Sequence, residues 1–71
     1  MKKIITLRKT REVGHMVHPN YTDWECTNHK TDNDYTHVVR IDDITGQIVA
    51  VYDLVHGCIN LTNRVEVVFN D

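Results

Sequence analysis

Apolar and polar residues alternate along much of this chain with a period of two, which is the period of side chains along a β-strand. The pattern is clearest in residues 35–53, where YTHVVRID and QIVAVYD flank the short string DITG. It predicts a β-hairpin whose turn ends at Gly46, because glycine readily adopts the positive φ that such turns require. The string is therefore expected to be a turn of about four residues between two strands.

The two faces of this hairpin follow from the same alternation. On the first strand, His37, Val39 and Ile41 are expected to share one face. On the second strand, Val49 and Val51 are expected to share a face, and the residues that alternate with them are apolar as well. A strand that is apolar on both faces is typically buried between neighbours, so we expect the second strand to be central in the sheet.

Four other segments are predicted to be extended. They are residues 3–9, residues 21–27 with Trp24 as a buried anchor, residues 58–61 and residues 64–69. The charged residues that follow the first of these are expected to continue it to about Val13 as an exposed edge, where Lys and Arg discourage unwanted pairing. No stretch shows a sustained apolar period of about 3.6 residues, so little or no helix is expected.

Together these elements predict an all-β, mainly antiparallel fold, a small barrel or bent meander of five to six short strands. Residues 1–71 are expected to form it as a single domain. Composition agrees, because Val, Ile and Thr occupy 24 of the 71 positions and Ala only one, and β-branched side chains suit a pleated surface. A core this small gains stability from a partner, and a homodimer is one such expectation.

One short string resembles a known signature. Ala50–Leu54 (AVYDL) is similar to the ALYDY signature of SH3 domains. In that family the signature lies near the N-terminus and helps to form a groove for proline-rich ligands. Here it falls on the fourth or fifth predicted strand, and the tryptophan expected downstream of it is absent. We therefore take from the resemblance only an SH3-like size and strand number, and not the ligand.

Charge divides the chain into a basic beginning and an acidic remainder. Residues 1–12 contain five basic residues and one acidic residue, whereas the other 59 residues contain nine acidic and three basic residues. Nucleic-acid-binding domains usually carry a strongly basic surface, but the net charge here is −2. This balance favours another protein as the partner, with a basic surface that meets the acidic middle of the chain. The predicted partner-binding residues are Asp23, Glu25, Asp32, Asp34, Asp42 and Asp43.

Catalysis is not expected. The chain contains no glycine-rich nucleotide motif, no H-E-x-x-H and no C-x-x-C, and no catalytic residue is predicted. His56 and Cys58 could bring an imidazole near a thiol, but a structural thiol near the core is the simpler interpretation, since no oxyanion donor or orienting acid accompanies them. We therefore expect a non-catalytic protein-binding module. It would be of the inhibitor or adaptor type that phages and mobile elements encode to dock on a host enzyme or defence complex.

The alternative is a metal-stabilised module that binds single-stranded nucleic acid. In such a module bases stack on aromatic side chains beside a basic groove. The residues that would form it are Lys2, Lys3, Arg8, Lys9, Arg11, Tyr21 and Trp24. The competing interpretation is a charged edge strand with the aromatic residues in the core, and the acidic remainder of the chain favours it.

Four potential zinc ligands occur within fifteen residues, spaced as H-x2-H and C-x2-H. They are His15, His18, Cys26 and His29. Zinc takes four nitrogen or sulfur ligands in a tetrahedron, so it would be the cofactor of the alternative module. Three histidines with one cysteine are an unusual structural set, however. The leading prediction therefore has no cofactor, with the histidines on the surface and Cys26 as a small buried apolar residue.

No segment predicts export or membrane insertion. The apolar run Ile4–Leu7 follows two lysines but ends at Arg8, which is short of the roughly 7–15 residues of a signal-peptide core. No segment approaches the roughly 18 apolar residues of a membrane span. We therefore expect a cytoplasmic protein with no membrane partner, in which Cys26 and Cys58 are reduced.

Overall fold

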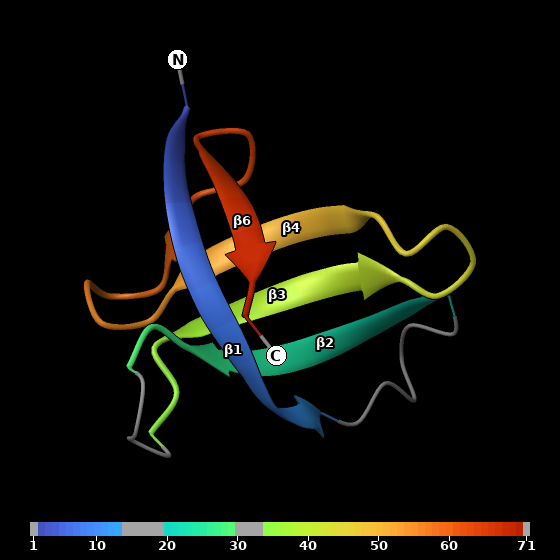
Figure 1. Ribbon diagram of the computed structural model, residues 1–71, viewed down its shortest axis with the longest axis horizontal. Coiled ribbons are helices and arrows are strands. Elements are labelled where there is room, and N and C mark those ends of the chain that lie inside the picture. Colours follow the sequence, from blue (N-terminus) through green and yellow to red (C-terminus); the bar gives the residue numbers. More distant parts are fainter. Residues whose placement is uncertain (1, 14–19, 30–33, 71) are drawn as a thin grey trace.

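The computed structural model describes residues 2–13, 20–29 and 34–70, and these residues form six strands and no helix (Figure 1). The strands are β1 (Lys3–Val13), β2 (Tyr21–Thr27), β3 (His37–Asp42), β4 (Ile48–Asp53), β5 (Ile59–Asn60) and β6 (Val65–Phe69). They form one mixed sheet in the order β5-β4-β3-β2-β1-β6, which curls into a half-barrel. The prediction of a small, mainly antiparallel all-β fold is confirmed.

Strand β1 divides its pairing between two neighbours. Its first part, Lys3–Leu7, pairs in parallel with β6, and its second part, Arg8–Val13, pairs antiparallel with β2. The register shifts at Thr10, whose hydroxyl donates to the Glu25 carbonyl at 2.7 Å. Such an irregularity increases local bending. The prediction that the strand reaches Val13 is confirmed. The prediction that this continuation is an edge agrees with the pairing, because Arg11–Val13 pair with β2 and β6 pairs only with Lys3–Leu7.

The predicted hairpin is present as β3 and β4. His37 and Val39 share one face and are 6% and 0% exposed, and Val39 lies opposite Val51 of β4. Strand β4 has β3 and β5 on its two sides, as its apolar faces indicated. The alternation along β4 is broken, however, because a register shift brings Ile48 opposite Ile41. The prediction that Val49 shares a face with Val51 is therefore wrong, and Ile48 takes that place.

The turn between β3 and β4 is closed by local hydrogen bonds. The Asp42 carboxylate accepts from the N–H groups of Ile44 at 2.8 Å and Thr45 at 3.0 Å. The Gly46 N–H donates to the Asp42 carbonyl at 2.9 Å, and Gly46 has a φ of 74°. Aspartate at the start of a turn commonly caps backbone N–H groups in this way. The bonds to the carboxylate, first that from Thr45 and then that from Ile44, hold the pKa of Asp42 below its ordinary value.

The core lies between the two ends of the curled sheet. Four buried residues from four strands form it: Leu7, Cys26, Val39 and Val51. The partly buried residues packed against them are Ile5, Trp24, Ile41, Leu61, Val65, Val67 and Phe69. The inward residues of β6 alternate as predicted, so β6 and the first part of β1 cover the core that β2, β3 and β4 support from the other side (Figure 1).

Candidate functional site

The two described members of the predicted zinc set differ in burial. Cys26 is fully buried in the core, and its thiol lies 3.5 Å from the Trp24 carbonyl. His29 is exposed just beyond the end of β2. His15 and His18 lie outside the described residues. Within the described ranges, no three His, Cys, Asp or Glu side chains come together in an arrangement that could hold a metal ion.

The predicted acidic surface is partly neutralised by the protein itself. Asp23 accepts from the Arg40 guanidinium at 2.9 Å, and Glu25 pairs with Arg11 at 2.9 Å. Asp42 caps the β3–β4 turn, and Asp43 accepts from the Thr22 hydroxyl. Asp34 is exposed, and Asp32 lies outside the described residues. Four of these six carboxylates therefore have partners in their own chain.

The two aromatic residues of the predicted nucleic-acid surface each contact a basic side chain, Lys9 from the predicted set and Arg40 from outside it. The Lys9 ammonium lies 5.1 Å from the centroid of the Trp24 ring, and Arg40 lies 5.6 Å from that of Tyr21. These are cation–π distances, so the cations cover aromatic faces on which bases would stack. Lys2 and Lys3 lie at the other end of β1 and line two different cavities. The structure thus places Lys2 and Lys3 apart from Lys9 and Trp24.

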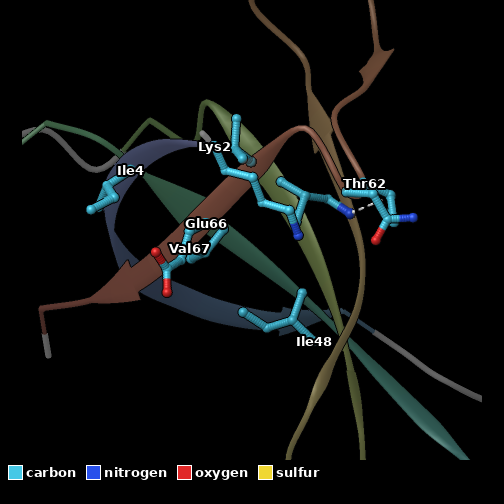
Figure 2. A pocket seen from close by; sticks show the side chains of 9 residues that line it. Lys2, Ile4, Ile48, Thr62, Glu66 and Val67 are labelled. Atoms are coloured by element: carbon cyan, nitrogen blue, oxygen red, sulfur yellow. Dashed lines mark hydrogen bonds between the residues drawn. The ribbon is translucent and has the colours of Figure 1, made fainter.

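A groove of about 550 Å³ follows β6, and we call it the β6 groove. It is lined by Lys2, Ile4, Ile48, Val51, Thr62, Asn63, Val65, Glu66 and Val67. Figure 2 shows these side chains around β6, with Ile48 and Thr62 coming from the segments that face it. Val51 donates to the Thr62 hydroxyl at 3.0 Å and accepts from the Leu61 N–H at 2.8 Å, which fixes one wall of the groove.

The β6 groove borders a strand edge that has no neighbouring strand among the described residues. Just after β6, the Asn70 N–H donates to the Leu7 carbonyl of β1 at 2.9 Å. Alternate residues of a strand direct their peptide groups to the same edge. Counting back from Asn70 in steps of two, the peptide groups of Glu66 point toward β1. Those of Val65 and Val67 point toward the opposite edge. The groove therefore combines apolar side chains with backbone donors and acceptors.

A second cavity, of about 530 Å³, lies where the ends of several strands meet, and we call it the histidine cavity. Its lining residues are Lys3, Ile5, Thr6, Asn28, His29, Thr36, His37, Asp53, Val55, His56, Leu61 and Val65. Sequence reasoning missed this cluster. The signal was available in part, because the hairpin register places His37 opposite Asp53 and His56 follows Asp53 by three residues.

Two ionisable groups of the histidine cavity have shifted pKa values. Burial lowers the pKa of His37, an effect that the nearby Asp53 carboxylate opposes. The pKa of Asp53 is lowered mainly because the carboxylate accepts a hydrogen bond from the His56 ring at 2.7 Å. Asp53 is thus held as a carboxylate beside His56, while the buried His37 favours its neutral form.

Both cysteines are free, and they occupy opposite environments. Cys26 is buried as predicted. Cys58 is exposed, in a turn where it has a φ of 59°, so the interpretation of Cys58 as a thiol near the core is wrong. The reason is that Cys58 lies just before the short strand β5, and the residues of β5 are not part of the core.

The chain matches no family model, no curated protein and no solved structure. In the ranges that the structure describes, no helix has the length and apolar character needed to cross a bilayer. The candidate sites therefore rest on their geometry, and the β6 groove and the histidine cavity each draw residues from several strands.

Proposed function

We propose that this chain is a non-catalytic protein-binding module that accepts an extended segment of its partner in the β6 groove. The observation that carries the proposal is the open edge of β6 beside an apolar groove. An extended peptide that adds to a sheet edge gains affinity from backbone hydrogen bonds and specificity from pockets for alternate side chains. The β6 groove offers both kinds of contact.

The chemistry of the groove describes the segment that fits it. Ile48, Val51 and Val67 would contact the apolar side chains of a strand that alternates apolar and polar residues. Lys2 and Glu66 also line the groove, one positive and one negative, so charged residues of the segment can meet an opposite charge. Such a segment would continue the sheet beyond β6 and cover part of the core.

The acidic middle of the chain remains a predicted contact surface within this proposal. Asp34 is exposed, and the carboxylates of Asp23 and Glu25 already balance arginines of their own chain. We expect these charges to influence the rate of encounter more than the affinity. This mode of binding suits an inhibitor or adaptor of the phage or mobile-element type. The host enzyme or defence complex to which it binds would supply the extended segment.

The test is selection of short random peptides on the immobilised protein, followed by binding measurements with two matched variants. Ile4→Glu places a charge on an exposed residue of the β6 groove, and Ile44→Glu places the same charge on an exposed residue of the β3–β4 turn. We expect enriched peptides to alternate apolar and polar residues. They should bind Ile4→Glu at least about tenfold more weakly, because a buried unpaired charge costs more than about 1.4 kcal/mol, and should bind Ile44→Glu normally.

Enriched peptides that bind both variants equally would contradict the proposal. If reversing the charges of Asp23, Glu25 and Asp34 weakened binding as much as Ile4→Glu does, the acidic surface would instead be the contact. The native mass of the unliganded protein identifies a further outcome. A dimer that Ile4→Glu dissociates and Ile44→Glu does not would mean that a second copy of the chain fills the groove.

A further inference from the structure

We infer that the histidine cavity binds a small organic oxyanion, a molecule that carries a carboxylate or a phosphate on an apolar body. This site is separate from the proposed partner contact, since the charged and hydrogen-bonding residues of the histidine cavity do not line the β6 groove. The two sites meet at Val65, which lines both, and the neighbouring lysines divide between them, Lys2 in the groove and Lys3 in the cavity.

Donor groups reach the histidine cavity from several elements. Lys3 comes from β1, Asn28 and His29 follow β2, His37 begins β3 and His56 follows β4. An ammonium, an amide and imidazole rings are the side chains that commonly bind oxyanions. Their convergence from distant parts of the chain is what a binding site requires and what a random polar surface lacks.

The Asp53 carboxylate in the cavity repels a bound anion less strongly than its negative charge alone would suggest. Asp53 accepts from the N–H of Val55 at 2.9 Å and of His56 at 3.4 Å, and from the His56 Nδ1 at 2.7 Å. These hydrogen bonds from Val55 and His56 partly offset the negative charge of the Asp53 carboxylate. Because Nδ1 of His56 is held by Asp53, the other ring nitrogen, Nε2, is the one that a ligand can reach.

The buried histidine is oriented in the same way. The Nδ1 atom of His37 lies 2.7 Å from the Thr36 hydroxyl, which in turn accepts from the Asn28 N–H at 3.1 Å. This arrangement fixes the ring and directs contact with a ligand to Nε2. The apolar part of the ligand has its own surface in Ile5 and Leu61, and the volume of about 530 Å³ suits a small organic molecule.

Binding is expected to strengthen as the pH falls, because histidines gain positive charge near neutrality. Among the described residues, the ionisable groups that line the cavity with His56 and His37 are Lys3 from β1, His29 after β2 and Asp53 from β4. Asp53 stays ionised throughout this range because its pKa is lowered. A cavity that gains positive charge as the pH falls is expected to bind an oxyanion more tightly at about pH 5.5 than at about pH 7.5.

The experiment is an NMR titration of the full chain with four probes at these two pH values. Phenyl phosphate and benzoate carry the two oxyanions on the same ring, inorganic phosphate lacks the ring, and benzyl alcohol lacks the charge. The matched variants are Lys3→Gln in the cavity and Lys2→Gln in the β6 groove. A third variant, His56→Asn, keeps a donor near the Nδ1 position and removes Nε2.

We expect phenyl phosphate, benzoate or both to shift the resonances of His37 and His56, and to bind at least about tenfold more tightly at the lower pH. Lys3→Gln and His56→Asn should each weaken binding about tenfold, and Lys2→Gln should leave it unchanged. Preference between phenyl phosphate and benzoate identifies the oxyanion. Equal binding of benzyl alcohol, equal effects of the two lysine variants, or no saturable shift with any probe would each overturn the inference.

Discussion

His37 connects the stability of a single buried side chain with pH. It is 6% exposed, and burial lowers its pKa below the ordinary value of 6.5. Between 6.5 and the lower pKa of the folded state, the unfolded chain binds a proton that the folded chain does not. The free energy of unfolding must then rise with pH in this window, and acidification must lower it. The effect is distinct from the titration of Asp42 and Asp53, whose pKa values are lowered from 3.8.

This sign gives a prediction for His37→Asn, which keeps a hydrogen-bonding group near the Nδ1 position. Urea unfolding of the original protein should show a lower free energy at about pH 5.5 than at about pH 7.5. The His37→Asn variant should show a smaller difference between the two pH values, whatever its absolute stability. An unchanged difference would mean that another group causes the pH dependence, and His56→Asn measured in parallel would identify the exposed histidine as that group.

The β3–β4 hairpin shows how one residue determines the conformation of an element. Gly46 has a φ of 74°, and a Cβ atom built there would meet no atom within 4 Å. The cost of Gly46→Ala is therefore one of backbone conformation and not of collision. We expect it to lower the free energy of unfolding by roughly 1–2 kcal/mol. Gly46→Asn should cost less, because asparagine adopts this conformation more readily. Thermal and urea unfolding of both variants measure the difference, and an equal cost for the two would contradict it.

Much of the element structure could be predicted from alternation alone, and the reasons for the exceptions are physical. The alternation in residues 21–27, 37–42 and 65–69 reports burial on one face, and these segments are strands. The register shift in β4 leaves no such signal, because Ile48, Val49 and Ala50 are all apolar and any of them could face the core. Local patterns also cannot show that Lys3–Leu7 would pair in parallel with β6, since that contact joins the two ends of the sequence.

The candidate sites follow the same rule. Residues close in sequence could be recognised, as in the zinc spacing and the run of acids. In the structure, however, most of the described acids have partners in their own chain, and Cys26 is buried whereas His29 is exposed. The β6 groove and the histidine cavity draw their residues from several strands, so they exist only once the sheet has formed. His37 and Asp53 were the exception, because a hairpin register alone places them opposite each other.

For the whole molecule, the pairing of β1 with β6 predicts that the shortened chain 1–63 cannot fold by itself. Without β6, Lys3–Leu7 loses its only paired strand among the described residues, and the core loses Val65, Val67 and Phe69. We expect no cooperative thermal transition for residues 1–63. A synthetic peptide of residues 64–71 should restore the transition, and the same peptide with Val67→Asp should not. A cooperative transition in the isolated fragment would show that β1 to β5 suffice.

The pairing of β1 with β6 also means that one strand is synthesised on the ribosome well before its partner. Lys3–Leu7 are made well before the strand they pair with, because Lys3 pairs with Val65 and β6 ends at Phe69. At about 5–20 residues per second, the early segment waits several seconds for its partner. During that time an apolar strand without a neighbour is available to other chains. The lysines and arginines among residues 2–11 are suited to limit this pairing, because like charges on two nascent copies repel each other.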